Sequence, residues 1–383
     1  MSIKWISNED DLDSFFALLN EEKMVCLDTE FIQEKSYQTK LELIQLGVNG
    51  DAYLLDYALN DVLGQNLLGE LVKNETITLI FHDLRADMQI LFNETGKVPK
   101  NVFDSQIAAN FCGFKNPKYG LLVLELLGLE LDKSKQRTNW SKRPFSNEEI
   151  EYAANDVIFL QELYPILYAR LEKNGNLDKY IEEIEHCANP QNFIPVNDDE
   201  VWKKISSGIS EPVELQRLKF LAEWREKRAR KKDIRPTALV KTQDLKLMAK
   251  LGINWDEDRF LGRYKSGRYK SLALGITPSI ERAENTPDNT WPKSPSIIKK
   301  NNPSISLILS ALREKISFDS GISAEIICST QTLAEFRQDD VPESLAEGWR
   351  FDLFTNTAIK LLNGEKSITI EGGEFVLRDS NKP

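Results

Sequence analysis

Residues 24–31 read Met-Val-Cys-Leu-Asp-Thr-Glu-Phe, an apolar run that leads into two carboxylates. The run predicts a buried strand over Met24–Leu27, and residues two apart on a strand point to the same face of the sheet. Asp28 and Glu30 are therefore expected to lie together, where their like charges repel unless a cation or hydrogen bonds compensate. An ordinary acidic turn or helix cap also explains such a pair. The stretch thus indicates a strand end and a candidate acidic site.

The segments around this strand predict an α/β domain. Further strands are expected over 41–46, 52–55, 77–81 and 102–103, and helices over 59–72, 84–92, 105–111 and 121–127. Ser146 and Glu149 have the spacing of a capping box, which opens a long helix toward Leu171. An antiparallel meander followed by alternating helices and strands is typical of a mixed sheet. The domain is expected to end near residue 180.

The remainder of the chain has little strand signal. Residues 201–269 predict short helices, including one over 215–230. Residues 304–383 predict a second helical module that ends in a hairpin over 367–377. Between the two, the proline-rich polar stretch at 279–303 predicts a linker.

Composition excludes several classes of protein. Basic residues number 49 and acidic residues 60, so the net charge is −11 and indicates no general polyanion-binding tail. Two histidines and four scattered cysteines, with no CxxC pair, argue against a Cys/His zinc site. No segment approaches the roughly 18 uninterrupted apolar residues that a membrane helix needs. With no secretory signal pattern at the N-terminus, a cytoplasmic protein without a membrane partner is expected.

Two later segments add candidate acids. Asp83 is placed to cap a helix that follows a strand, whereas Asp87 lies one turn further on and has no capping role. Tyr152 and Asp156 are spaced i, i+4 and share one face of the long helix. The two alanines between them are small enough to let that face approach a sheet closely. Each feature alone is also explained by a solvated Asp or a half-buried Tyr, so the indication comes from their combination.

Taken in order, these acids and the tyrosine resemble the DEDDy branch of the ribonuclease H-like 3′→5′ exonucleases. Within that branch the chain is similar to the ribonuclease D family over about residues 5–175. Besides the acids, the segments that carry the similarity are Lys40–Leu46, Phe103–Ala109, Tyr119–Leu121 and Leu131–Pro144. Phe145 departs from the family, which usually has Leu there, but the position stays apolar.

The helical remainder fits the same family. Leu221–Arg225 is similar to the HRDC module that follows the nuclease domain, and Glu347–Arg350 looks like part of a second, more divergent module. The resemblance implies a multidomain α/β plus α protein with a ribonuclease H-like mixed-sheet exonuclease domain. The implied domains are 1–180 for the exonuclease, 195–278 for the HRDC domain, 279–303 for the linker and 304–383 for the HRDC-like domain.

The resemblance also implies an activity and a site. It indicates a 3′→5′ exoribonuclease that releases nucleoside 5′-monophosphates from RNA 3′ ends, with transfer-RNA precursors as substrates. The implied ligands of two divalent ions, Mg²⁺ or Mn²⁺, are Asp28, Glu30, Asp87 and Asp156. Tyr152 would orient the attacking water or assist its deprotonation.

Other functions remain to be separated from this one. A DNA exonuclease of the same DEDDy branch has the same residues, and a non-catalytic RNA-binding scaffold would represent a different class of protein. The presence of all four acids and the tyrosine argues against the scaffold. The DEDDh branch requires His five residues before the last Asp, and position 151 is Glu, which excludes it.

Positive charge is concentrated in two segments. Residues 131–143 hold five basic residues against one acidic, and residues 217–235 hold nine against three. Such runs are often only solvated helix faces, but in this family they indicate phosphate contacts. The expected substrate contacts, with base stacking for the first of them, are Phe31, Lys133, Arg137, Trp140, Arg143, Arg225 and Arg228. Because every implied metal ligand precedes residue 180, a nuclease that lacks residues 190–383 is expected to fold.

Overall fold

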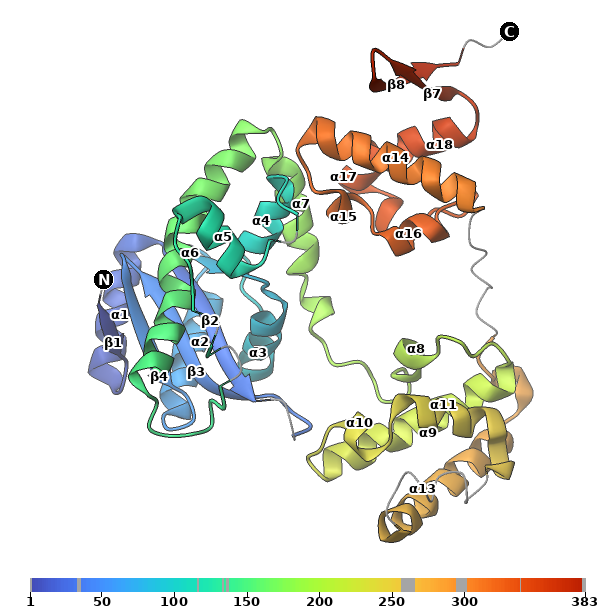
Figure 1. Ribbon diagram of the computed structural model, residues 1–383. Coiled ribbons are helices and arrows are strands. Elements are labelled where there is room, and N and C mark those ends of the chain that lie inside the picture. The colour runs from blue at the N-terminus through green and yellow to red at the C-terminus, as the bar shows by residue number, and fades with distance from the viewer. Residues whose placement is uncertain are drawn as a thin grey trace. The chain divides into compact units, whose positions relative to one another are not determined.

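A computed structural model describes residues 2–32, 36–115, 117–132, 134–135, 138–255, 266–293, 302–337 and 339–380. The chain forms two compact units (Figure 1). The first combines Met1–Glu30, Leu41–Phe193 and Ile298–Pro383, and the second combines Phe31–Lys40 and Ile194–Ile297.

A six-stranded mixed sheet forms the centre of the first unit, and the sequence predicts a mixed sheet with five of these strands. Its strands are β1 (Ile3–Trp5), β2 (Met24–Ile32), β3 (Lys40–Val48), β4 (Asp51–Asp56), β5 (Thr78–Phe81) and β6 (Val102–Asp104). They lie in the order β1-β4-β3-β2-β5-β6. β3 and β4 pair antiparallel, whereas β1 with β4, β2 with β5, and β5 with β6 pair parallel. β1 is an edge strand that the sequence analysis did not predict.

Helices cover both faces of this sheet because successive strand residues point to opposite sides. On β4, Leu54 packs with Ala153 of the long helix α6 (Asn147–Lys173), whereas Leu55 lies beside Gly64 of α2 (Asp61–Lys73). The capping box of α6 is present, with Ser146 N donating to Glu149 and Glu149 N to Ser146 Oγ. The helices of this part are α1 (Glu9–Glu22), α2 (Asp61–Lys73), α3 (Arg85–Thr95), α4 (Ser105–Phe111), α5 (Tyr119–Leu127), α6 (Asn147–Lys173) and α7 (Leu177–Cys187).

The C-terminal module belongs to the same unit and packs on α4 and α7. Its elements are α14 (Pro303–Ser320), α15 (Ala324–Ile327), α16 (Thr330–Glu335), α17 (Gly348–Arg350), α18 (Asn356–Leu362) and the predicted hairpin of β7 (Lys366–Glu371) and β8 (Glu374–Asp379). The Trp349 ring meets the Phe111 ring at 5.0 Å, and Ser323 N donates to Asn110 O over 2.8 Å. These contacts argue against a nuclease domain that is complete without residues 190–383, because their loss exposes an apolar face of α4.

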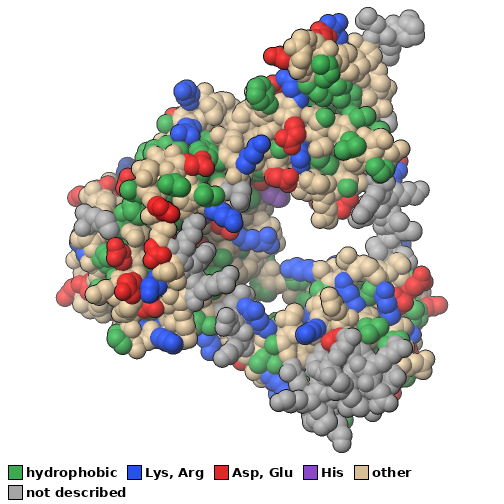
Figure 2. Space-filling model, in the orientation of Figure 1, with side chains coloured by type: hydrophobic (Ala, Val, Ile, Leu, Met, Phe, Trp, Pro, Cys, Tyr) green, Lys and Arg blue, Asp and Glu red, His purple; other side chains and the backbone are tan. Residues whose placement is uncertain are grey.

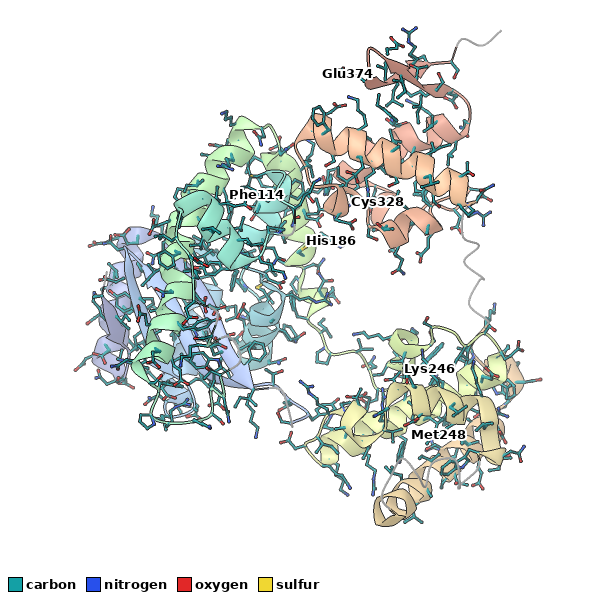
Figure 3. All side chains as sticks on the ribbon, viewed as in Figure 1. Phe114, His186, Lys246, Met248, Cys328 and Glu374 are labelled. Carbon is teal, nitrogen blue, oxygen red and sulfur yellow. The ribbon has the colours of Figure 1, made fainter. Side chains whose placement is uncertain are left out.

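The second unit is helical. Its helices are α8 (Trp202–Ile205), α9 (Pro212–Lys231), α10 (Pro236–Leu239), α11 (Thr242–Leu251) and α13 (Ser266–Glu284), and its core includes Leu221 and Met248 (Figure 3). Tyr37 contacts α9, where its hydroxyl donates to Glu226 Oε2 over 3.1 Å, and its backbone N donates to Asp233 Oδ1, just after the helix, over 3.0 Å. The predicted linker at 279–303 is wrong at its start. Helix α13 continues to Glu284, because Ile280 is fully buried in this core.

None of the described helices is long and apolar enough to cross a membrane.

Candidate active site

Parallel strands place the candidate acids at one end of the sheet. In the pairing of β2 with β5, Cys26 lies opposite Ile80. Asp28 follows Cys26 by two residues and His82 follows Ile80 by two, so the two side chains lie at the same level of these neighbouring strands. β5 ends at Phe81, whereas β2 continues past Asp28 to Ile32, beyond the end predicted at Leu27. Because α3 starts directly after β5, Asp87 comes to the same edge from its first turn.

Three carboxylates meet at this edge. Oxygen atoms of Asp28, Glu30 and Asp156 all lie within 4.8 Å of one another. Asp87 is buried beside them and accepts a hydrogen bond from the Thr29 hydroxyl, and the charge of Asp28 contributes to its raised pKa. The structure therefore brings together three of the four predicted ligands and places the fourth next to them.

Small residues allow α6 to carry Asp156 into this position. Ala153 and Ala154 are fully buried between the helix and its neighbours, as the sequence predicts. On the sheet side, a Cβ atom at Gly47 would lie 2.5 Å from the carbonyl oxygen of Val157, well inside van der Waals contact. Glycine at position 47 is therefore required for the close approach of α6 to β3.

The acids of this site have raised pKa values. Burial raises the pKa of Asp28 to about 7. Burial, together with repulsion from Asp28, raises the pKa of Glu30 to about 10. The pKa of Asp156 is raised well above its ordinary value, again through burial first and repulsion from Asp28 second. Each shift disfavours the ionised form, so the site is complementary to added positive charge.

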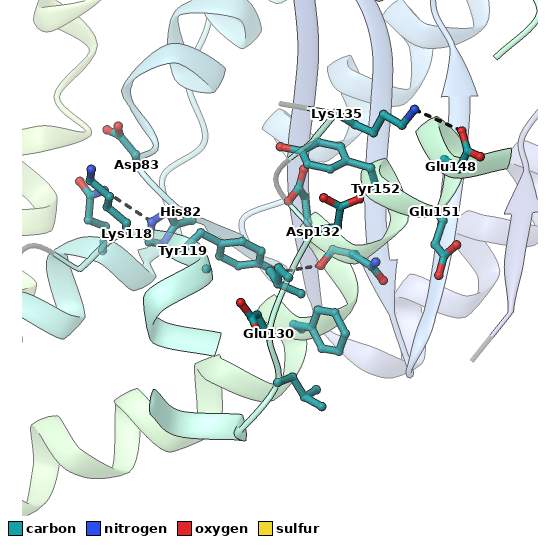
Figure 4. A pocket seen from close by; sticks show the side chains of 17 residues that line it. His82, Asp83, Lys118, Tyr119, Glu130, Asp132, Lys135, Glu148, Glu151 and Tyr152 are labelled. Atoms are coloured by element: carbon teal, nitrogen blue, oxygen red, sulfur yellow. Dashed lines mark hydrogen bonds and ion pairs between the residues drawn. The ribbon is translucent and has the colours of Figure 1, made fainter. Parts of the chain in front are cut away.

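The acids line a cavity of about 230 Å³, here called the carboxylate cavity. Its other lining residues are Leu27, Thr29, His82, Tyr119, Tyr152 and Leu160. Four of its residues also line a much larger cleft of about 1000 Å³, the wide cleft, shown in Figure 4. A small acidic cavity at the side of a roomy cleft suits a reacting group at the end of a longer substrate.

Tyr152 stands between the cavity and the cleft. Its hydroxyl bonds to the carboxylate of Asp156, one helical turn away. Burial, followed by the charges of Asp156 and Glu30, raises the pKa of Tyr152 above its ordinary value. The phenol therefore stays protonated at neutral pH and acts as a hydrogen-bond donor.

Comparison with known proteins places this arrangement in a family. A family profile described as 3′-5′ exonuclease matches residues 3–172. The ribonuclease D of Jannaschia sp. (strain CCS1) is 30% identical, over 96% of this chain and 97% of its own length. The chain belongs to the ribonuclease D family. Ribonuclease D of Bartonella henselae is 29% identical over 97% of this chain and 93% of its own.

The fold agrees with that assignment. The crystal structure of Escherichia coli RNase D matches with a TM-score of 0.79 and 24% identity, covering 95% of this chain and 99% of the other. As a member of the ribonuclease D family, the chain is a 3′→5′ exoribonuclease. Enzymes of this exonuclease class depend on divalent metal ions, for which the carboxylate cluster provides oxygen ligands.

Two of the substrate contacts predicted near this site are structural residues. Trp140 is 2% exposed and packs against Phe145 and Tyr152, so its ring is not available to a base. The guanidinium of Arg143 donates to both carboxylate oxygens of Asp56 over 2.5 and 2.6 Å and lies over the Phe145 ring. The substrate role expected of both residues is therefore wrong in this structure, because protein groups already occupy their contact surfaces.

In the second unit, the prediction for Arg225 is also wrong. Its side chain is 2% exposed and donates to Val240 O and Thr242 Oγ1 inside the core. Arg228 is half-buried and stays a prediction. Figure 2 shows several Lys and Arg side chains on the surface of this unit, and those of Lys231 and Lys232 are exposed.

The remaining predicted contacts are not decided by the structure. Lys133 and Arg137 lie outside the described residues. Phe31 is half-buried at the end of β2 and is not among the described residues that line either cavity. Base stacking by Phe31 stays a prediction.

Sequence reasoning missed Asp104, a buried residue that organises the site edge. One of its oxygens accepts from Leu84 N over 2.6 Å and the other from Ile107 N over 2.8 Å, so it caps α4 and fixes the loop before α3. Asp83, the predicted cap, instead adopts a left-handed backbone with φ of 63°. The signal was present in Phe103–Ala109, where an Asp directly precedes a helix.

In the absence of divalent ions, the free energy of unfolding is expected to fall as pH rises from about 4 through about 7. Folded Asp28 keeps its proton up to about pH 7, against an ordinary value of 3.8, so the folded protein binds more protons than the unfolded chain in this window. Glu30, with its pKa raised to about 10, extends the decline. Thermal melts of chelator-treated protein at about pH 5 and about pH 8 measure the slope.

Added Mg²⁺ should raise Tm more at the higher pH, because metal ligands must be deprotonated to bind. The Glu30→Gln variant, which cannot titrate at this position, should show a shallower decline. An equal slope in the variant and the unchanged protein would contradict the assignment of the pH effect to this site.

Proposed function

We propose that Asp28, Glu30, Asp87 and Asp156 hold two divalent ions, Mg²⁺ or Mn²⁺, and that the enzyme releases nucleoside 5′-monophosphates from RNA 3′ ends. Transfer-RNA precursors are the proposed substrates. The observation that carries the proposal is the meeting of three carboxylates within 4.8 Å beside a fourth.

The donor set fits such ions. Carboxylate oxygens are the hard ligands that Mg²⁺ and Mn²⁺ prefer. Among the described residues that line the carboxylate cavity there is no Lys or Arg. His82 adds no positive charge at neutral pH, because burial lowers its pKa to about 4. Because no cation among these described residues balances the charge of the four acids, two divalent cations can balance it.

Phosphodiester hydrolysis requires charge stabilisation at the attacking and leaving oxygens, which two bound divalent ions supply. Residues of the chain itself orient the reacting groups. Tyr152, protonated and held by Asp156, offers a directed hydroxyl at the mouth of the cavity. From there it orients the attacking water rather than removing its proton, because a phenol with a raised pKa is a poor base at neutral pH.

Tyr152→Phe is expected to lower kcat by about tenfold to a hundredfold while changing RNA affinity by less than about twofold. The substitution removes the orienting hydroxyl and keeps the ring that packs on Trp140. Single-turnover rates and equilibrium binding of the same labelled RNA separate the two quantities. Tyr164→Phe is the matched control, since Tyr164 lies on the same helix and packs against Phe103 instead of the acids. Equal losses of rate and affinity would assign Tyr152 a structural or gripping role.

The proposed substrate class has separate support. The Escherichia coli enzyme of the same fold is described as an exoribonuclease involved in structured RNA processing. In this chain, exposed Lys231 and Lys232 at the end of α9 offer phosphate contacts outside the nuclease site. Phosphate contacts outside the nuclease site suit a substrate with a folded body, such as a transfer-RNA precursor.

Digestion assays test the proposal. Labelled single-stranded RNA, single-stranded DNA and a 3′-extended transfer-RNA precursor are each incubated with the full-length chain and Mg²⁺, Mn²⁺ or chelator. We expect metal-dependent release of nucleoside 5′-monophosphates from both RNAs, with the precursor trimmed back to its mature end. Preferential digestion of DNA would favour the DNA exonuclease, and RNA binding without digestion would favour the scaffold.

A further inference from the structure

Three neighbouring hollows of the first unit share lining residues. The carboxylate cavity shares four lining residues, including His82 and Tyr119, with the wide cleft. At its other side the wide cleft shares Asp83 and Gln106 with a further hollow of about 390 Å³, here called the side hollow. The side hollow shares no described lining residue with the carboxylate cavity, so the three hollows, here together called the groove, follow one another away from the acids.

The walls of the wide cleft are mostly acidic. Besides Asp156, its acidic lining residues are Asp83, Glu130, Asp132, Glu148 and Glu151. Lys135 is neutralised by Glu148 at 3.1 Å. Lys118 is exposed on the opposite side, with His82 and Asp83 (Figure 4), and forms no ion pair with another residue that the structure describes. Among the described residues that line this cleft, Lys118 is therefore the positive charge available to an RNA phosphate.

The side hollow also has an exposed basic side chain among its described lining residues. Arg85 lines it at the start of α3, is exposed, and forms no ion pair within the described part of the chain. His186 and Asn192 add polar groups to the opposite wall, from and just after α7 (Figure 3). Lys118 and Arg85 thus lie in successive sections of the groove, with Gln106 where the sections meet.

We propose that this groove holds the RNA strand on the 5′ side of the terminal nucleotide. Lys118 contacts the first phosphate upstream of the scissile one, and Arg85 contacts a later phosphate. The inference rests on the proposed function, because it assumes that the terminal nucleotide enters the carboxylate cavity. Because the walls of the wide cleft are mostly acidic, RNA phosphates are expected to bind at the exposed side chains of Lys118 and Arg85.

Two rings that line both the carboxylate cavity and the wide cleft, those of Tyr119 and His82, support this path. The Tyr119 hydroxyl donates to Asn155 O over 2.8 Å, which fixes the ring in the wall. The His82 ring lies 5.3 Å from it and is held through Ser105 Oγ at 2.8 Å. Fixed rings beside a basic residue are the elements with which proteins bind single strands without reading sequence.

The test uses 5′-hydroxyl RNAs of increasing length with full-length Lys118→Ala and Arg85→Ala. A dinucleotide has only the scissile phosphate, so its cleavage should be unchanged in both variants. From the trinucleotide upward, Lys118→Ala should raise KM about three- to fivefold, the upper range for an exposed ion pair, with kcat unchanged. Arg85→Ala should show a similar rise only with longer RNAs. Lys97→Ala, an exposed lysine outside the groove, is the matched control.

Salt dependence provides a second measurement. For binding of an octanucleotide in an Asp28→Asn background, each variant should lower the log–log salt slope by about 0.7, the value for one phosphate on a single strand. KM values and slopes equal to those of Lys97→Ala would overturn the proposal. So would an effect of Lys118→Ala on the dinucleotide as large as on longer RNA, since that would place Lys118 at the scissile phosphate. Absence of RNA cleavage by the unsubstituted chain would instead refute the proposed function.

Discussion

Asp28→Asn is expected to reduce exoribonuclease turnover by at least about a thousandfold, or about 4 kcal/mol in activation free energy. Asp28 is the acid whose charge acts on Glu30, Asp87 and Asp156 alike, which places it at the centre of the cluster. An amide in its place removes a charged ligand shared by the whole site. Single-turnover cleavage of labelled RNA at saturating Mg²⁺ measures the loss.

The fold should survive this change. Replacing a buried carboxylate that repels its neighbours relieves strain, so chelator-treated Asp28→Asn should melt at or above the temperature of the unsubstituted protein. Mg²⁺ should raise the Tm of the variant less, because stabilisation by a ligand follows its affinity for the folded state. Glu151→Gln is the matched control. It makes the same chemical change on an exposed acid of the same cleft and should keep turnover within about twofold. A variant that retains a tenth of the original turnover would remove Asp28 from the metal site.

The core of the site followed from local sequence because its geometry is local. Asp28 and Glu30 share a strand face, and Tyr152 and Asp156 share a helix face, so spacing alone fixed each pair. The capping box at Ser146 set the start of α6 for the same reason. Joining the pairs required the family resemblance, since nothing in either segment specifies that Asp156 of α6 lies beside Asp28 of β2.

The wrong predictions came from residues whose environment is set by distant parts of the chain. The basic, polar segments that contain Trp140, Arg143 and Arg225 predict exposed side chains. Arg143 is instead paired with Asp56, 87 positions away, and Arg225 with a carbonyl on the segment after α10. Arg side chains usually keep the charged head in water while burying the stem, but an Arg whose guanidinium is paired can be buried completely. Charge in a sequence window therefore indicates composition, not exposure.

The position of the C-terminal module was unpredictable for a related reason. Its contact with α7 depends on Glu183, an unremarkable acid in an amphipathic helix. The Glu183 carboxylate accepts from the two terminal guanidinium nitrogens of Arg350, over 2.6 and 2.8 Å, and from the Trp349 indole over 3.0 Å. These partners lie more than 160 positions away along the chain.

Glu183→Ala is expected to lower the free energy of unfolding of the first unit by about 3 kcal/mol, the lower range for breaking a buried ion pair. Glu183 is 7% exposed, and its removal leaves Nη1 and Nη2 of Arg350 and the Trp349 indole without this acceptor. Denaturant unfolding monitors the loss, and hydrogen exchange should show faster exchange at Ser323, whose amide bonds to Asn110 O of α4. Proteases should then cleave the C-terminal module more rapidly.

Two further variants separate the ion pair from a general defect of α7. Glu185→Ala lies on the exposed face of the same helix and should change stability by less than about 0.5 kcal/mol. The double variant Glu183→Met with Arg350→Met replaces both charges by apolar groups and should recover most of the lost stability, because no buried charge is left unpaired. A Glu183→Ala protein as stable as Glu185→Ala would show that Trp349 and Phe111 hold the module without this carboxylate. A double variant no more stable than Glu183→Ala would attribute the loss to packing.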